Sequence, residues 1–369
     1  MARWASRKGI DLLGTGDVIH PEWLDSIGRC LSPADESGIY ELAGVRFLLT
    51  GEVSLVWRQD GRGRRIHLVL LIPSIHDAKR VSDELSKRGN ITSDGRPILG
   101  LSACDALETI WNAAPETVVI PAHVWTPWYS VFGAKSGFDS LEACFGAHAG
   151  RIRAIETGLS SDPAMIRRWS ALDDLQLVSC SDAHSLSKLG REATVFDLAE
   201  ASFAAIADAL ATGKGHAGTI EYHPEMGKYH HDGHRACGVE WMPSETRAHD
   251  GICPVCGRAV TIGVLHRVEE LCDRARPAGS DVVRYIVPLD EILAWVHGVG
   301  TNTVRVRATA DALISRFDTE LDVLLHVPEQ ELRDASDPEI ASAIQTVRQG
   351  DIRVRPGYDG VYGRLEVAS

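Results

Sequence analysis

Residues 175–184 end in an aspartate and a histidine separated by one residue, Asp182 and His184. Residues 175–180 are short and apolar, which predicts a buried strand. Alternate side chains of a strand point the same way, so Asp182 and His184 are expected to project together from its carboxyl end. A carboxylate and an imidazole there suit Zn, Mn or Fe better than Mg or Ca. The alternative is a polar strand end with a hydrogen-bonded aspartate and an exposed histidine.

Metal-type side chains also follow other segments that we predict as strands. The predicted strands span residues 10–13, 45–50, 66–72, 117–120, 152–156 and 175–180. The side chains at or just past their ends are Asp17, His20, Glu52, His123, Glu156, Asp182 and His184. Helical segments alternate with these strands, which favours parallel strands with helical crossovers, and barrels of that kind gather functional groups at the carboxyl ends of the strands. Glu156 is a ligand, an orienting group or a buried polar group; His67, inside the third strand, is expected to be structural.

A second group of metal-type residues lies further along the chain. His234 and Cys237 are spaced by two residues, and so are Cys253 and Cys256, which predicts a structural zinc site with all four positions filled. His230 and His231 lie close enough to leave the identity of the fourth ligand open. The alternative is a set of reduced thiols.

The chain is predicted to be mostly helical from residue 277. Residues 291–296 lead to Gly298-Val299-Gly300, and a further helix is expected from Thr301. This pattern resembles a helix-hairpin-helix, in which glycines let the backbone approach a phosphate. The predicted DNA-binding residues are Gly298, Gly300, Arg305, Lys188 and Arg191. An ordinary tight turn between helices fits the pattern equally well.

Length and composition set wider limits. The 369 residues allow two or three domains, and the 44% apolar and 24% charged fractions are typical of globular proteins. A net charge of −13 argues against a nonspecific polyanion binder but not against a nucleic-acid enzyme with a local basic groove. The N-terminus lacks the apolar core of a signal peptide, so we expect a cytoplasmic protein without a membrane segment.

Taken in order, these segments resemble the PHP (polymerase and histidinol phosphatase) metal-dependent phosphoesterases and, within them, the endonuclease Q family. The resemblance covers nearly the whole chain. The segments that carry it are GTGDVIHP (14–21), GE (51–52), PAH (121–123), SDAH (181–184), YHHDGH (229–234), the Cys253–Cys256 pair, GVLHRVEE (263–270) and PGYDGVY (356–362).

The resemblance implies an α/β fold: a PHP-type distorted (β/α)7 barrel with its first strand missing, a small zinc-binding insert and a C-terminal helical domain. The expected boundaries are 1–225 for the metallo-phosphoesterase barrel, 226–275 for the zinc-binding module and 276–369 for the helix-hairpin-helix-like domain. It also implies a DNA repair endonuclease that cuts 5′ of deaminated bases (uracil, hypoxanthine or xanthine) or of abasic sites.

One departure from the family concerns the N-terminus. Members begin with a strand that carries His-x-His, and this chain has no such motif before Gly14. We interpret the difference as a start codon assigned too late rather than as a defective protein, because the remaining ligands are intact.

The resemblance also implies a set of site residues. Divalent ions (Zn, Mn or Mg) are expected on Asp17, His20, Glu52, His123, Asp182 and His184 together with the missing histidine pair, and Asp17, Asp182 and His184 are the predicted catalytic residues. Trp125, Trp128 and Tyr129 follow His123 and are expected either to stack on an extruded base or to belong to the core. The predicted partner is DNA, bound by a monomer; recruitment of a sliding clamp stays open.

Two other functions compete. One is a PHP phosphatase acting on a small phosphorylated metabolite, which would need neither the zinc insert nor the helical tail. The other is a DNA-binding accessory protein with an inactive metal site.

Overall fold

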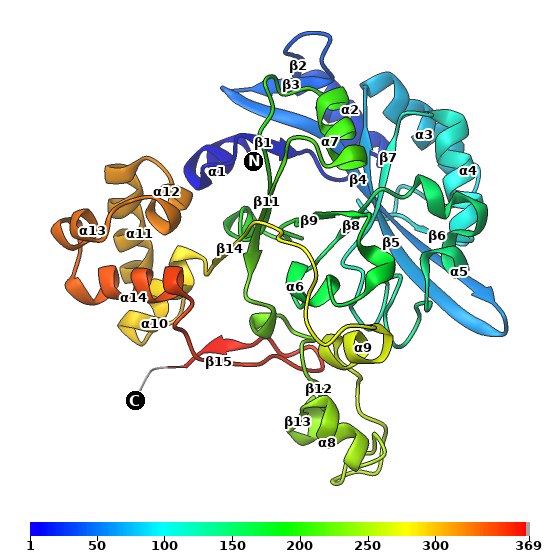
Figure 1. Cartoon of the computed structure of the whole chain (residues 1–369). Coiled ribbons are helices and arrows are strands. Elements are labelled where there is room, and N and C mark those ends of the chain that lie inside the picture. The colour runs from blue at the N-terminus through cyan, green and yellow to red at the C-terminus, as the bar shows by residue number, and fades with distance from the viewer. Residues whose placement is uncertain (367–369) are drawn as a thin grey trace.

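The computed structural model describes residues 1–366 (Figure 1). The α-helices are α1 Ala2–Lys8, α2 Pro21–Cys30, α3 Ile75–Ser86, α4 Ala103–Ala113, α5 Leu141–Phe145, α6 Pro163–Ile166, α7 Phe203–Thr212, α8 Pro243–Ala248, α9 Val264–Leu271, α10 Leu289–His297, α11 Val304–Phe317, α12 Glu320–Leu325, α13 Glu329–Ala335 and α14 Pro338–Gln349. Short 3-10 helices are η1 Gly146–Arg151, η2 Ser170–Leu172, η3 Leu186–Lys188, η4 Pro224–Met226 and η5 Arg235–Cys237. Among the described residues, no helix is long and apolar enough to cross a membrane.

The strands are β1 Leu12–Gly14, β2 Ser32–Pro33, β3 Ile39–Leu42, β4 Val45–Gln59, β5 Arg62–Ile72, β6 Ile98–Leu99, β7 Val118–Pro121, β8 Ala154–Glu156, β9 Gln176–Val178, β10 Ala193–Phe196, β11 His216–Tyr222, β12 Asp232–His234, β13 Val239–Trp241, β14 Val283–Ile286, β15 Val354–Arg355 and β16 Arg364–Leu365. The largest sheet has seven strands and runs in the order β2-β3-β4-β5-β7, with β1 and β6 also paired to β4. Smaller sheets are β8-β9, β10-β11-β14, β12-β13 and β15-β16.

Strand β4 is the centre of the large sheet and differs most from the sequence prediction. It was expected to end at Thr50, yet it continues to Gln59 and returns as β5 through Asp60-Gly61. Both turn residues have positive φ, at 52° and 75°, which is the geometry that Asp-Gly hairpins favour. Figure 1 shows this long hairpin projecting from the molecule.

The expected parallel barrel is therefore not confirmed. Strand β4 pairs antiparallel with β5, and β5 pairs antiparallel with β7, while β1–β4 and β8–β9 are parallel as predicted. Within residues 1–366 the paired strands form no closed sheet. The fold is a mixed α/β arrangement, and the predicted division into three regions stays a prediction.

The C-terminal helices share one apolar core. Leu293, Val306, Leu313 and Ile344 belong to it, and Ile220 of β11 joins it from the other part of the chain. Helix α1 contacts α12, and Figure 1 places α1 between the large sheet and the C-terminal helices.

The C-terminal segment returns to the middle of the molecule. The amide of Gly357 donates to the carbonyl of Glu225, and the amide of Gly363 donates to the carbonyl of Met226. A Cβ on either glycine would lie 2.2 Å from a backbone oxygen, so this close approach requires glycine at both positions. The turn at residues 356–363 is thus fixed against the segment 225–228.

Candidate metal centre

Three ligand-type side chains, on β4, on β5 and just after β7, meet at one rim of the large sheet. Glu52, His67 and His123 each offer a donor atom, and these atoms lie within 4.8 Å of one another. Glu52 Oε1 is 2.8 Å from His67 Nδ1, and His67 Nδ1 is 3.1 Å from His123 Nε2. This spacing brings a carboxylate and two imidazoles to a common point.

The long hairpin explains how two of these residues meet. In the register of β4 and β5, Glu52 faces Val69, and Ser54 faces His67. Glu52 and His67 are therefore diagonal neighbours on one face of the sheet, within reach of each other's side chains. His67 was expected to be structural because the antiparallel pairing was not foreseen. Tyr129 now packs against its ring, with centroids 4.7 Å apart.

Three predicted metal ligands have a left-handed backbone. Asp17 has φ 51°, His123 has φ 31° and Asp182 has φ 42°. Such values are uncommon outside glycine, although Asp and His tolerate them better than most residues. Strained positions of this kind cluster at functional sites, where the surrounding structure holds them.

The surroundings of the cluster set the protonation states of its ligands. Burial opposes ionisation of Glu52, but the hydrogen bond from His67 and the charge of His123 lower its pKa to about 2. Burial, together with the charge of His67, lowers the pKa of His123 to about 4. At neutral pH, Glu52 is therefore a carboxylate and His123 a neutral imidazole, which are the forms that bind metal.

A buried carboxyl group contacts the backbone of one residue of this cluster. Glu156 is 3% exposed, and its Oε2 accepts the backbone N–H of His123 at 2.7 Å. Burial, with the charges of Glu52 and Asp182, raises the pKa of Glu156 well above its usual range. A cation at the rim would favour ionisation of Glu156, so the donors present fit a divalent ion.

The other predicted ligands are placed less closely. Asp17 and Asp182 are electrostatic neighbours of the cluster. Burial, the charge of Asp94 and then the charge of Glu52 raise the pKa of Asp17. The charge of Asp182 raises the pKa of His123, against the larger effect of burial. The ring of His20 faces the carbonyl of Thr92 at 3.3 Å. The side chain of His184 is 76% exposed, with Nδ1 3.0 Å from the carbonyl oxygen of Asp182. The assignment of His20 and His184 as ligands stays a prediction.

Sequence reasoning missed one cationic side chain at the rim. A guanidinium nitrogen of Arg96 lies 3.3 Å from Glu52 Oε1. The neighbouring Gly95 lies so close to Asp17 that an added Cβ would be 2.3 Å from the carboxylate. The loop before β6 thus brings a positive charge onto two predicted ligands, and no spacing pattern in the sequence signals this contact.

The residues of the second predicted ligand group lie close together. Donor atoms of His234, Cys237, Cys253 and Cys256 lie within 4.8 Å of one another. Gly238 and Gly257, which follow the second ligand of each half, have φ 66° and 71°, so the chain turns sharply after each ligand pair. Three thiols and one imidazole are a donor set typical of structural zinc.

The predicted DNA-binding residues differ in their availability. Lys188 Nζ lies 2.8 Å from Glu291 Oε1, and Arg191 donates to the backbone carbonyls of Ser181 and Asp182. Arg191 is 8% exposed and acts as a brace for the loop that carries Asp182. Gly298, Gly300 and Arg305 are exposed at the α10–α11 connection, where α11 begins at Val304 rather than Thr301.

Of the three predicted stacking residues, one is buried and two are partly exposed. Trp125 is 1% exposed and contacts the rings of Phe132 and Trp169, so the core interpretation applies to it. Trp128 packs edge-on against Tyr229 at 5.8 Å, and Tyr129 covers His67.

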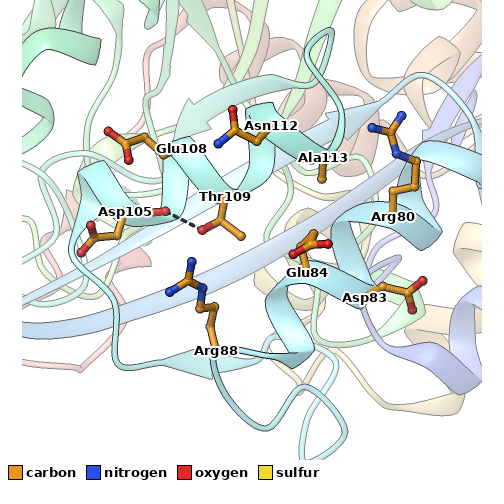
Figure 2. A pocket seen from close by; sticks show the side chains of 9 residues that line it. All are labelled: Arg80, Asp83, Glu84, Arg88, Asp105, Glu108, Thr109, Asn112 and Ala113. Atoms are coloured by element: carbon orange, nitrogen blue, oxygen red, sulfur yellow. Dashed lines mark hydrogen bonds between the residues drawn. The ribbon is translucent and has the colours of Figure 1, made fainter.

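A separate hollow of about 470 Å³ lies between α3 and α4 (Figure 2). Its lining residues are Arg80, Asp83, Glu84, Arg88, Asp105, Glu108, Thr109, Asn112 and Ala113. Carboxylates outnumber guanidinium groups there, which disfavours a phosphate backbone. The hollow shares no residue with the metal-type clusters.

Comparison with known proteins relates this geometry to a family. The uncharacterised protein YqxK of Bacillus subtilis is 32% identical over 380 residues, covering 98% of this chain and 90% of that protein. The crystal structure of the lesion-specific endonuclease PfuEndoQ from Pyrococcus furiosus superimposes with a TM-score of 0.87 at 29% identity, covering 99% of this chain and 89% of that one. Endonuclease Q in complex with a 27-mer duplex substrate, with an abasic lesion at the active site, gives 0.89 at 29% identity, covering 100% and 91%. The chain belongs to the endonuclease Q-like PHP proteins.

Two family models match parts of this endonuclease Q-like chain. A PHP-associated model covers residues 164–214, which include the loop of Asp182 and His184. The model of the MJ0043 C-terminal domain covers residues 288–351, the segment of α10 to α14. The uncharacterised protein MJ0043 of Methanocaldococcus jannaschii is 31% identical over 250 residues, which are 65% of this chain and 31% of that protein.

Proposed function

We propose that this protein is a metal-dependent endonuclease of DNA repair that cuts 5′ of a deaminated base or an abasic site. The observation that carries the proposal is the convergence of Glu52, His67 and His123 within 4.8 Å, in a chain that superimposes on lesion-specific endonuclease Q. The related complex holds duplex DNA, which favours DNA over a small phosphorylated metabolite as the substrate class.

In this proposal Glu52, His67 and His123 hold divalent ions, with Asp17 and Asp182 beside them. Carboxylate and imidazole donors favour Zn or Mn over Mg. Bound ions of this kind polarise a phosphoryl oxygen and lower the pKa of a bound water. The chain's own contribution is to hold the ligands in place, through the carboxyl group of Glu156 on the backbone of His123 and the ring of Tyr129 on His67.

We also propose that one structural zinc ion binds His234, Cys237, Cys253 and Cys256. The buried apolar residues around them are Val239, Cys253 and Val260. A core of this size contributes little to the folding free energy of the module. Metal binding would therefore supply much of that free energy.

The backbone of the rim argues against an inactive accessory protein. Left-handed φ values at three residues cost on the order of 1–3 kcal/mol each for side chains that do not tolerate them, and less for Asp. A protein that only binds DNA gains nothing from holding Asp17, His123 and Asp182 in this way.

The test is cleavage by the full chain of a duplex that contains one uracil, with Mn²⁺, Zn²⁺ or Mg²⁺ added in turn, and of a generic phosphomonoester in parallel. We expect incision of the duplex and no turnover of the monoester. Asp182→Asn should abolish incision while DNA binding persists, because binding rests on other residues. Asp25→Asn, at an exposed aspartate outside both clusters, is the matched control. Hydrolysis of the monoester without incision of the duplex would instead support the alternative, a PHP phosphatase.

A further inference from the structure

The long hairpin of β4 and β5 carries a concentration of positive charge. Its outer part, residues 57–67, holds the arginines Arg58, Arg62, Arg64 and Arg65. The only acidic residue in this segment is Asp60. Because the whole chain has a net charge of −13, its attraction to a polyanion depends on local regions of this kind. Figure 1 shows the tip of the hairpin beyond the body of the molecule.

Two of these arginines share a face of the sheet with candidate metal ligands. Every second residue of a strand points to the same side. Glu52 and Arg58 are an even number of residues apart on β4, and so are Arg65 and His67 on β5. Since Glu52 and His67 lie on one face, Arg58 and Arg65 project from that face too. Arg62 is an odd number of residues from Arg65 and projects from the opposite face.

Both arginines on the metal face are exposed and keep hydrogen-bond donors available. The guanidinium group of Arg58 donates to the carbonyl of Gly61, and that of Arg65 lies 5.6 Å from the centre of the Tyr129 ring. Within the described part of the chain, neither side chain pairs with a carboxylate. A guanidinium group has five N–H donors in a fork that matches two oxygens of a phosphate, so both side chains can accept this ligand.

The spacing of the two arginines places them in a row that leads away from the candidate metal centre. An antiparallel strand rises about 3.4 Å per residue, so Arg65 lies about 7 Å from His67 along the hairpin. Arg58 is opposite Gly63 and lies about 14 Å from His67. A DNA duplex rises about 3.4 Å per base pair, so these distances correspond to about two and about four base pairs.

We propose that this hairpin face binds the phosphate backbone of duplex DNA on one side of the lesion, through Arg58 and Arg65. This inference rests on the proposed nuclease function and adds a DNA contact outside the metal centre. Guanidinium–phosphate contacts fix the position of a duplex without reading its sequence. Because the face is continuous with Glu52 and His67, these contacts align the duplex with the metal ligands.

The experiment measures binding of a uracil-containing duplex by fluorescence anisotropy, using the full chain with Asp182→Asn so that the DNA stays intact. Arg58→Ala and Arg65→Ala should each make the slope of log K against log salt less steep by about 0.9, the contribution of one phosphate contact on duplex DNA. Arg58→Lys keeps the charge and should keep the slope. The matched control is Arg62→Ala, at an exposed arginine of the same hairpin on the opposite face, which should also leave the slope unchanged.

A second measurement tests the position of the contacts. The flank on one side of the uracil is shortened to about three base pairs, which lies between the expected positions of the two arginines. On the duplex shortened on the hairpin side, Arg58→Ala should no longer differ from its parent, whereas Arg65→Ala should still reduce the slope. Shortening the other flank should leave both effects in place.

Unchanged slopes in both alanine variants, or a fall in Arg62→Ala as large as theirs, would overturn the proposal. Equal effects of shortening either flank would overturn it as well. Failure to bind any duplex would refute both this contact and the nuclease function. A wild-type chain that fails to cut, while these binding results hold, would refute the nuclease function alone.

Discussion

The two groups of metal-type ligands differ in how much protein surrounds them. Glu52 and His67 stand on the long paired strands β4 and β5, whose inner faces belong to the largest apolar core. The cysteine group instead lies on the short elements β12 and η5 and on a loop, around three buried residues. Protein packing therefore positions the rim ligands, whereas we propose that the cysteine module depends on the bond to its metal. In this proposal the fold positions the first metal site, and the metal stabilises the fold around the second.

Loss of a rim ligand should give the largest effect on activity and little effect on folding. His123→Asn removes an imidazole from the cluster, and Asn tolerates the left-handed backbone of that position. We expect incision of the uracil duplex to fall to the uncatalysed background while the melting temperature changes little. His148→Asn, at a partly exposed histidine outside the cluster, is the control. A large fall in melting temperature would instead show that folding depends on the rim ligands, as we expect for the ligands of the cysteine module.

Loss of a module ligand should have the opposite character. Cys256→Ser removes one thiolate of three, so one metal ion per chain should be lost, as measured by elemental analysis. Amide hydrogen exchange should accelerate across residues 232–262 and stay unchanged in β4 and β5. Cys30→Ser, at another exposed cysteine, should leave metal content and exchange as they are. Faster exchange in the long hairpin would show that the two sites are not independent.

A smaller effect is expected from the carboxyl group under the rim. Glu156→Gln has the shape of the protonated acid, which burial favours without metal, so stability should be retained. It cannot become a carboxylate when a cation binds, so metal affinity at the rim should fall by about 10- to 100-fold, the usual range for groups that orient a ligand. Titration calorimetry with Mn²⁺ measures this change. Glu116→Gln, at an exposed position, should bind as wild type does.

The smallest expected effect is a slope of stability against pH. Burial raises the pKa of Glu221 from 4.5 to about 8, while its carboxylate accepts hydrogen bonds from Ser179 and Thr157. A raised folded pKa gives stability that is fully present below pH 4.5 and is lost as the pH rises toward 8. Glu221→Gln does not titrate, so its melting temperature should fall less than that of wild type between pH 5 and pH 8 as measured by calorimetry. Parallel curves would mean that Glu221 ionises in the folded protein as it does in water.

The sequence predicted the cysteine module more fully than the rim, for a physical reason. Both halves of the module are read from spacings of two residues, which are local. The neighbourhood of Glu52 and His67 depends on the register between two strands, and register is set by the turn that joins them. The Asp60-Gly61 pair is a hairpin signal, and with it the antiparallel pairing and the place of His67 were within reach of sequence reasoning.

Other contacts were beyond it. Arg96 reaches Glu52 from a loop without periodicity, and Lys188 pairs with Glu291 across 103 positions of the chain. The strand predicted at 117–120 was close to β7, but those at 45–50 and 66–72 covered only parts of β4 and β5. The antiparallel pairing of β5 with β4 and β7 was not predicted.

The ion pair between Lys8 and Glu320 joins the N-terminal helix α1 to helix α12 of the C-terminal part. The ammonium group lies 2.8 Å from the carboxylate, and both side chains are less than one tenth exposed. Removing one partner of such a pair costs about 3–5 kcal/mol, because the other charge stays buried. Helix α1 thereby holds the C-terminal helices against the rest of the molecule. We therefore expect these helices to keep their position relative to the large sheet when a ligand binds.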